Sequence, residues 1–269
     1  MGGIVRDADP STATAALAAS KAAFAELLGS LPGASAHERP GVRWVDTGLP
    51  DSVFNGVHDV AAEGFADSVA LVRAHFAARG VPFHWETGLR PEPPDSDAIL
   101  TGHGLRHVED EPGMWLDLTR PRPAAPAVAG LSIRPVADDE ALRDWVWTWG
   151  CGAPDEVTEP WYRAYSALPH GPGTALRMFV GYLGGRPAVT AYLFLAAGVA
   201  AVHYVVTRPE HRRLGLGTAM TATVLDEAVD AGRRVAVLTA SPSGTGIYRR
   251  LGFRECCLVR TYEWGPPAG

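Results

Sequence analysis

The stretch HRRLGLGTAM at residues 211–220 constrains the fold more than any other part of the chain. Two arginines and two glycines stand directly before an apolar run with helical spacing. Glycine loses more backbone freedom on folding than any other residue, so a helix entrance that contains two of them needs a reason. The preceding residues 199–207, VAAVHYVVT, are rich in β-branched residues and predict a strand. We therefore expect a strand, a glycine turn and a helix in succession.

A turn of this kind is suited to bind an anion. The first N–H groups of a helix have no partner within the helix, and the helix dipole adds positive potential there. Gly215 and Gly217 would let a ligand come within hydrogen-bonding distance of the backbone. Positive charge for a ligand with more than one phosphate would come from Arg208, Arg212 and Arg213. The turn thus predicts a pyrophosphate ligand.

Two common phosphate-binding motifs do not fit this turn. A P-loop requires GxxxxGK[ST], and the turn contains no lysine. The dinucleotide fingerprint requires a third glycine at the position of Met220. The pyrophosphate ligand must therefore belong to another class.

Composition and charge restrict the partners and the compartment. A formal net charge of −6 and a charged fraction of 20% argue against a general binder of nucleic acids or membrane surfaces. The three cysteines, Cys151, Cys256 and Cys257, have no CxxC spacing, and two adjacent cysteines cannot form an unstrained bridge. We expect free thiols in a reducing cytoplasm, no bound metal, no signal peptide and no membrane span.

A proline-rich stretch divides the chain, which at 269 residues is long enough for two domains. The prolines in TRPRPAAPAVAG, residues 119–130, would break a helix or a strand, so this stretch predicts a linker. The expected parts are an N-terminal domain at residues 1–118, the linker at 119–130 and a second domain at 131–269.

The second domain has the alternating pattern of an α/β fold. Its predicted order is β-α-α-β-β-β-α-β-α-β-β, with a hairpin turn at residues 184–186 and a helix over residues 214–231. The run RVAVLTAS is almost wholly apolar, as expected for a strand buried on both faces. A short helix from Thr245 to Leu251 and then two strands finish the chain.

The N-terminal domain shows a weaker form of the same ending. A helix in ADSVALVRAHFAARG and a strand in VPFHWET precede the segment ILTGHGLRHVEDEPGMWLDL, which parallels GIYRRLGFRECCLVRTYEW. Each segment predicts a pair of strands. The similarity predicts an internal repeat, in which residues 64–66, Gly-Phe-Ala, stand where the second copy has its glycine-arginine turn.

The turn itself carries a family resemblance. Arg212 to Gly217 match the pattern [RQ]-x-x-G-x-[GA] of the GNAT superfamily of acyl-CoA-dependent N-acyltransferases. Pro209 before the turn, the helix and strand after it, and IYRRLGF in the place of that family's Y-x-x-x-G-[FY] element extend the match. The sequence therefore resembles a tandem GNAT protein. This implies a mixed central sheet flanked by helices in each half, and a degenerate first copy that lacks the coenzyme turn.

The resemblance implies acetyl-CoA as the co-substrate and no metal. Backbone amides of the turn would hold the pyrophosphate, and pantetheine would pair with the strand before it. The amide of Val206 would lie near the acyl carbonyl as an oxyanion donor. Ser241 or Ser243 would replace the contact of an asparagine found in the family. The residues implied in coenzyme binding are Val205, Val206, Thr207, Arg212, Arg213, Leu214, Gly215, Leu216, Gly217, Thr218 and Ser241.

Two further residues are implied in proton transfer. Tyr248 matches the tyrosine that protonates the departing thiolate, and its alternative is a half-buried helix tyrosine without that role. The family's glutamate base aligns with Ala201, so His203, two residues along on the same strand face, becomes the candidate base. Its alternative is a hydrogen-bonded core histidine. Glu210 and His211 are expected in solvent.

The acceptor would be a primary amine of a small molecule or peptide. It would bind at the first two helices of the second domain, where the aromatic residues are Trp145, Trp147, Trp149, Trp161, Tyr162 and Tyr165. Tryptophans spaced by two lie on different helix faces, and Asp155, Glu156 and Glu159 are either solvated or attract a cationic amine. The implied reaction is direct acetyl transfer in a ternary complex, by a monomer or homodimer. The missing glutamate leaves a non-catalytic acyl-CoA-binding sensor or interaction module as the alternative.

Overall fold

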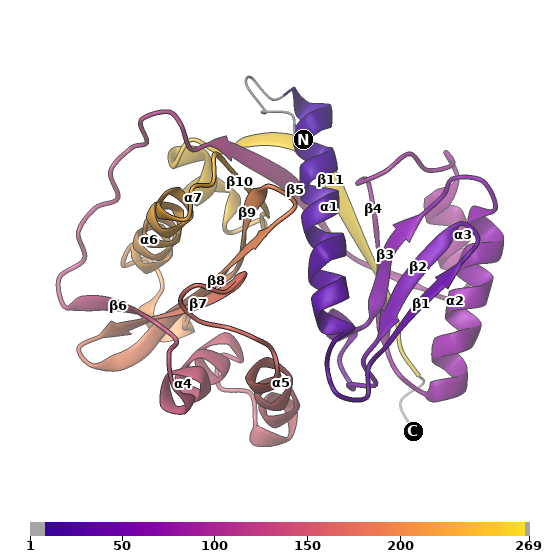
Figure 1. The fold of residues 1–269 in the computed structure, drawn as a ribbon, viewed down its shortest axis with the longest axis horizontal. Coiled ribbons are helices and arrows are strands. Elements are labelled where there is room, and N and C mark those ends of the chain that lie inside the picture. Colours follow the sequence, from indigo (N-terminus) through magenta and orange to yellow (C-terminus); the bar gives the residue numbers. More distant parts are fainter. Residues whose placement is uncertain (1–8, 267–269) are drawn as a thin grey trace. The chain divides into compact units, whose positions relative to one another are not determined.

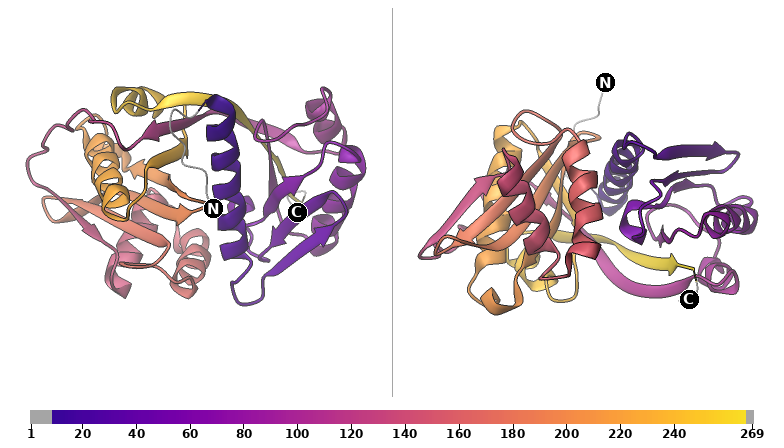
Figure 2. Two further views of the ribbon diagram at one scale, coloured as in Figure 1. Left: turned by 45° about the horizontal axis from the view of Figure 1, so that its top comes forward. Right: turned by 90° about the horizontal axis from the view of Figure 1, so that it is seen from below.

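The computed structural model describes residues 9–266. The chain divides into two compact units. The N-terminal unit contains residues 9–113 and 256–266, and the C-terminal unit contains residues 114–255. Figures 1 and 2 show the elements of each unit along the chain.

The C-terminal unit is built on a mixed sheet. Its strands follow the order β6-β7-β8-β9-β10-β5. Antiparallel pairs join β6 to β7, β7 to β8 and β8 to β9, whereas β9 and β10 are parallel. The strands are β5 (Arg106–Asp117, of which the end belongs to this unit), β6 (Leu131–Pro135), β7 (Leu176–Leu183), β8 (Arg186–Ala196), β9 (Val199–Thr207) and β10 (Val235–Thr239).

Helices cover both faces of this sheet (Figure 2). One face carries α4 (Asp139–Trp149) and α5 (Asp155–Ala167), and the other carries α6 (Leu216–Asp230) and α7 (Thr245–Arg250). Strand β8 is therefore buried from residue 188 to residue 195, which explains why most of these residues are apolar. The predicted hairpin turn is confirmed, because Gly184 and Gly185 have φ angles of +57° and +82° between β7 and β8.

The strands of the N-terminal unit follow the order β1-β2-β3-β4-β11-β5, again with both antiparallel and parallel pairs. Helix α2 packs its buried aromatic residues, among them Phe65 and Phe76, against Phe83 and Trp85 of β4. The predicted helix and strand here are confirmed as α2 and β4. The elements are α1 (Pro10–Leu28), β1 (Ser35–Arg39), β2 (Val42–Asp46), the short 3-10 helix η1 (Ser52–Phe54), β3 (Gly56–Val60), α2 (Phe65–Arg79), β4 (Phe83–Thr87), α3 (Ser96–Gly102) and β11 (Arg254–Trp264).

The strand pairs predicted at the end of each copy are wrong, because each copy ends in one long strand. These strands are β5 and β11. The segment RECCLVRTYEW of β11 contains no turn residue, so nothing in it reverses the chain. Residues 112–113, Pro-Gly, continue β5 in an extended conformation. Each long strand begins in one unit and ends in the other.

The division of the chain therefore differs from the expected boundaries at residues 118 and 131. Arg260 to Trp264 of β11 pair with Thr87 to Phe83 of β4, so the end of the chain completes the N-terminal unit. In the C-terminal unit, the backbone N–H of Leu118 donates to the carbonyl of Arg234. Residues 119–130 form neither helix nor strand. Within residues 9–266, no helix has the length and apolar character needed to cross a membrane.

The entry of β11 into the N-terminal unit can be tested at Gly88. A Cβ at this position would lie 1.9 Å from the carbonyl oxygen of Leu258, and Gly88 has a φ of +86°. Gly88→Ala combines left-handed strain of about 1–2 kcal/mol with an overlap that typically adds about 1–3 kcal/mol. The free energy of unfolding, measured with urea, should fall accordingly.

Gly33→Ala provides the matched control. Gly33 has nearly the same φ, +83°, but no other described residue beyond its chain neighbours would come within 4 Å of a Cβ added there. This variant should lose only the strain, about 1–2 kcal/mol. Equal losses in the two variants would contradict the contact between β4 and β11.

Candidate active site

A β-bulge interrupts β9 just before the glycine turn. Tyr192 of β8 is paired with His203, but Thr190 is paired with Val206, so β9 holds one extra residue between these pairs. Tyr204 lies in this interval with a φ of +49°, which is rare for a residue with a side chain. The bulge interrupts the ladder with β8, which resumes where Thr190 pairs with Val206 and Val189 with Thr207.

Two buried side chains of the C-terminal unit hold the bulge in place. The Thr190 hydroxyl donates to the carbonyl oxygen of Tyr204 at 3.1 Å, and Trp145 Nε1 donates to the carbonyl oxygen of Ala191 at 3.0 Å. Neither Thr190 nor Trp145 has measurable exposure to solvent. Both hydrogen bonds therefore satisfy backbone groups at the place where the ladder is broken, as buried polar groups require.

The pairing of β9 with β10 ends before the bulge. Within the described residues it covers Ala200 with Ala236 and Ala201 with Val237, and goes no further toward the end of β9. Residues 206 and 207 stay paired with β8 on one side, and residues 205–207 have no paired residue of β10 on the other. Figure 1 shows α6 and α7 beside these strands. Beyond Ala201, β9 therefore presents an edge to β10 that is not paired with it, next to the predicted turn.

The turn between β9 and α6 has the conformation expected for an anion site. Arg213 and Gly215 have φ angles of +67° and +84°, and Gly215 is the residue before the helix. Among the described residues, no side chain makes a capping hydrogen bond at this helix start. The first backbone N–H groups of α6 are therefore available to a ligand. Arg212 and Arg213 are exposed, as is Leu214 with 51% of its surface.

Gly217 brings the parts of the site together. A Cβ on Gly217 would lie 3.6 Å from Thr207 Oγ1, 3.8 Å from Val205 Cγ1 and 3.6 Å from Ile247 Cδ1. The first turn of α6, the end of β9 and helix α7 therefore meet around this residue. The absence of a side chain here keeps that space open.

Arg208 differs from its predicted role as a source of charge for the turn. Its guanidinium lies 3.6 Å above the ring of Trp147, and its Nε donates to Glu210 at 2.7 Å. The hydrogen bond from Arg208 lowers the pKa of Glu210, so this carboxylate stays ionised. Arg208 therefore serves mainly to join the start of the turn, through the 3-10 helix η2 (Pro209–His211), to α4.

Tyr248 lies in α7 with its ring close to the backbone. It is 8% exposed, packs edge-to-face on Phe253, and its Cε2 would be 3.0 Å from a Cβ on Gly244. Tyr248 directly follows Ile247, which borders the space at Gly217. Ser241 has a local structural contact, because its hydroxyl accepts from the Gly244 backbone N–H at 3.3 Å.

His203 lies on the face of the sheet that α4 and α5 cover. Its ring is 4.9 Å from that of Tyr192, and the neighbouring Tyr204 stacks on Trp149 at 4.5 Å. Burial raises the pKa of Tyr192 well above its usual range, so this phenol stays neutral. His203 is half-buried, and its Nε2 is among the buried side-chain atoms.

The aromatic residues of α4 lie on different faces of the helix, some buried and some exposed, as their spacing predicts. Trp145 is fully buried, whereas Trp147 is 45% exposed. Trp149 contacts Trp161 of α5 with 4.2 Å between the ring centres. Helix α5 begins at residue 155, so Asp155 and Glu156 occupy its first turn, where their negative charge interacts favourably with the helix dipole. These two acidic residues and Glu159 are therefore part of a helix.

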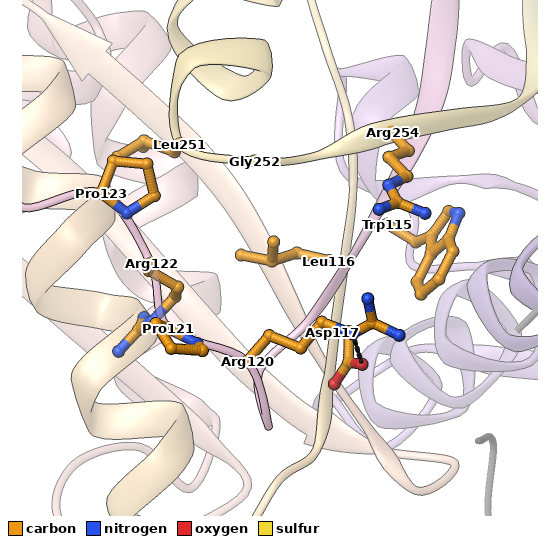
Figure 3. A pocket seen from close by; sticks show the side chains of 10 residues that line it. All are labelled: Trp115, Leu116, Asp117, Arg120, Pro121, Arg122, Pro123, Leu251, Gly252 and Arg254. Carbon is orange, nitrogen blue, oxygen red and sulfur yellow. Dashed lines mark hydrogen bonds and ion pairs between the residues drawn. The ribbon is translucent and has the colours of Figure 1, made fainter. Parts of the chain in front are cut away.

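A separate cavity of about 270 Å³ lies at the end of β5 and does not coincide with this site (Figure 3). Arg120 and Arg254 border it, the first paired with Asp117 and the second over the ring of Trp115. No predicted site residue is among those that line it, which are Trp115, Leu116, Asp117, Arg120, Pro121, Arg122, Pro123, Leu251, Gly252 and Arg254.

Comparisons with known proteins agree with this geometry. Residues 196–256 match the family model described as acetyltransferase (GNAT) domain. A GCN5-related N-acetyltransferase from Kribbella flavida is similar over 93% of this chain and 96% of that chain, with a TM-score of 0.69 and 22% identity. A tandem GNAT protein from the clavulanic acid biosynthesis pathway is similar over 95% of both chains, with a TM-score of 0.58 and 17% identity.

A GCN5-related N-acetyltransferase from Sphaerobacter thermophilus is similar over 86% of this chain and 76% of that chain, with a TM-score of 0.58 and 18% identity. None of the curated proteins matches the chain. Residues 196–256 are thus similar to a GNAT domain, and the predicted tandem GNAT fold is confirmed. The sequence did not reveal Thr190 and Trp145 as supports of the bulge, because their partners depend on the strand register.

The support of the bulge gives a testable prediction. Thr190→Val keeps the shape of the side chain but leaves the Tyr204 carbonyl without its buried hydroxyl partner. Loss of this hydrogen bond should lower the free energy of unfolding by about 1–3 kcal/mol in urea denaturation. Thr190→Ser retains the hydroxyl and should lose clearly less. Equal stability of the Val variant and the parent protein would show that Thr190 does not support the bulge.

Proposed function

We propose that the C-terminal unit is an acetyl-CoA-dependent N-acetyltransferase that acts on a primary amine of a small molecule or peptide. One arrangement carries the proposal. A bulged strand with a free edge, a glycine turn without a side-chain cap among the described residues and the helix of Tyr248 meet around Gly217. This arrangement suits a long ligand with a diphosphate at one end and a thioester at the other.

The coenzyme would bind along this opening. The backbone amides of residues 213–218, together with Arg212 and Arg213, would hold the pyrophosphate at the start of α6. Pantetheine would pair with residues 205–207, as a peptide pairs with an exposed strand edge. The amide of Val206, directly after the bulge, would donate to the acyl oxygen as negative charge develops on it.

The transfer would proceed in a complex of enzyme, acetyl-CoA and amine. The amine nitrogen attacks the thioester carbon, and the new C–N bond forms as the C–S bond breaks. The sulfur takes its proton from the Tyr248 hydroxyl, and the attacking nitrogen gives a proton to His203, directly or through a water. His203 then releases a proton to solvent, and Tyr248 regains one before the next turnover.

The acceptor would approach from the side of α4 and α5. His203 and Tyr204 lie on this face, beside Trp149 and Trp161. Aromatic rings favour a cationic or partly apolar amine, through cation–π attraction and the burial of apolar surface. Such an amine would lose one proton to solvent before the attack, and His203 would take the second proton as the C–N bond forms.

A single observation favours a second function, an acyl-CoA-binding module without turnover. Ala201 occupies the strand position of the family's glutamate base, and it is fully buried. A fully buried alanine methyl can neither take up a proton nor orient a water. Release of free coenzyme A from acetyl-CoA on any member of a panel of amines would exclude the module. Coenzyme binding with no release on every amine would support it.

Substitutions at Gly217 test whether acetyl-CoA binds at this turn. The nearest described atoms would lie 3.6 Å from an added Cβ, so Gly217→Ala should fold normally and keep most of its affinity for acetyl-CoA. Gly217→Leu would fill the space between β9 and α7 and should weaken binding by at least a hundredfold in calorimetry. Thermal unfolding of both variants serves as the control for folding. Undiminished affinity of a folded Leu variant would exclude the pyrophosphate turn.

A substitution at Tyr248 tests its proposed role as the proton donor to the departing sulfur. Tyr248→Phe removes the proton donor and keeps the ring that packs on Phe253. The rate of acetyl transfer should fall by about 10²–10⁴-fold, the usual contribution of general acid catalysis. The dissociation constant of acetyl-CoA should stay within about threefold, because the lost hydroxyl would act mainly on the departing sulfur. Normal turnover by the Phe variant would exclude Tyr248 as the acid.

A further inference from the structure

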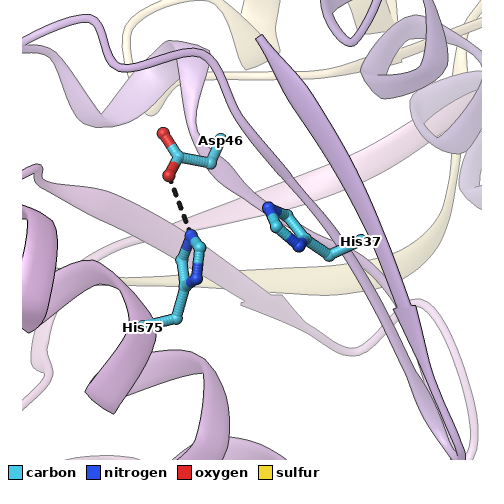
Figure 4. Close-up of side chains that lie close together, drawn as sticks. All are labelled: His37, Asp46 and His75. Carbon is cyan, nitrogen blue, oxygen red and sulfur yellow. Dashed lines mark hydrogen bonds and ion pairs between the residues drawn. The ribbon is translucent and has the colours of Figure 1, made fainter.

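Three side chains of kinds that can bind a metal ion lie close together in the N-terminal unit, and none of them is a residue of the proposed reaction. They are His37, Asp46 and His75 (Figure 4). One potential ligand atom of each residue lies within 4.8 Å of the others. We refer to these three residues as the His–Asp–His cluster.

The fold brings the cluster together from three elements. In the β1–β2 hairpin, Ser35 is paired with Asp46 and His37 with Trp44, so these residues share one face of the hairpin. His75 comes from α2, which packs on that face. Arg79 follows His75 by four residues and therefore lies on the same side of the helix. The sequence separates His37 and His75 by 38 positions, and no motif connects them.

Neighbouring groups fix the orientation of the ligands. The Asp46 side chain is fully buried, and its Oδ1 accepts from the Gly48 backbone N–H at 2.8 Å. His75 Nε2 lies 2.8 Å from Asp46 Oδ2. The ring of His37 stacks on Trp44, and the two histidine rings are 4.5 Å apart. Ligands held in this way need little reorganisation to bind an ion.

We propose that the His–Asp–His cluster binds Zn²⁺ or a similar divalent transition metal ion. Two imidazoles and one carboxylate are a common ligand set for such ions, with a further position left for water or another ligand. Ligand bonds of about 2.0–2.2 Å place ligand atoms about 3.3 Å apart in tetrahedral geometry. The cluster reaches this geometry by side-chain adjustments of about 1 Å, since its atoms already lie within 4.8 Å.

Arg79 is the competitor of the ion. Its Nε lies 2.6 Å from Asp46 Oδ2, the same oxygen that His75 contacts. The Arg79 side chain is 47% exposed, so it can turn into solvent at little cost when an ion replaces it. A bound ion would join the β1–β2 hairpin to α2 in place of this ion pair.

The test uses the full chain without a histidine tag, freed of metal with a chelator and titrated with Zn²⁺ in a calorimeter. The expected result is one ion per chain and a rise in the unfolding temperature. His37→Ala and His75→Ala should each weaken binding by at least tenfold. His107→Ala is the matched control, because His107 is exposed and lies outside the cluster in the same unit. Absence of stoichiometric binding, or equal affinity in all three variants, would overturn the proposal.

The variant Arg79→Gln distinguishes two explanations of the cluster, a metal site and a purely structural ion pair between Arg79 and Asp46. Removal of the competing cation should strengthen Zn²⁺ binding severalfold, whereas the unfolding temperature of the metal-free protein should fall. If Asp46 serves only as the partner of Arg79, the second effect appears without the first. Unchanged or weaker Zn²⁺ affinity in Arg79→Gln would therefore contradict the site as described.

Discussion

The bulge in β9 is the constraint on which the rest of the candidate site depends. An extra residue at Tyr204 interrupts the pairing with β8, and hydrogen bonds from the buried side chains of Thr190 and Trp145 satisfy backbone groups at the interruption. Such bonds are difficult to rearrange in a core of low dielectric constant. Because the pairing of β9 with β10 ends at Ala201, one edge of β9 has no strand partner next to the glycine turn among residues 9–266. A regular strand would close this space.

The two units share a fold but differ in the side chains found at equivalent places. Helices α2 and α6 both begin after a glycine in the left-handed conformation, Gly64 and Gly215. Only the second of these follows an arginine-rich turn. The N-terminal unit instead gathers His37 and His75 around a buried carboxylate. A duplicated fold thus supports different sites, since function depends on side chains placed on a scaffold.

Much of the fold could be predicted because its signals are local. The strand, turn and helix around Gly215 follow from β-branched residues, glycine positions and helical spacing, and the GNAT resemblance extended them to a fold. The strand pairs predicted at the two ends were wrong because each segment forms one long strand, and RECCLVRTYEW contains no turn residue that would divide it. Arg208 was predicted to supply charge to the turn. Its stacking on Trp147 could not be predicted, since it depends on how α4 packs.

The sequence by itself determined the order of the elements, the glycine turn at residues 213–217 and the position of Tyr248 in a helix after it. These features depend on backbone preferences and side-chain periodicity within a few residues. Only the tertiary structure decided the register that creates the bulge, the pairing of residues 260–264 with β4 and the meeting of His37, Asp46 and His75. Each of these depends on contacts between segments far apart along the chain, and local preferences carry no information about such partners.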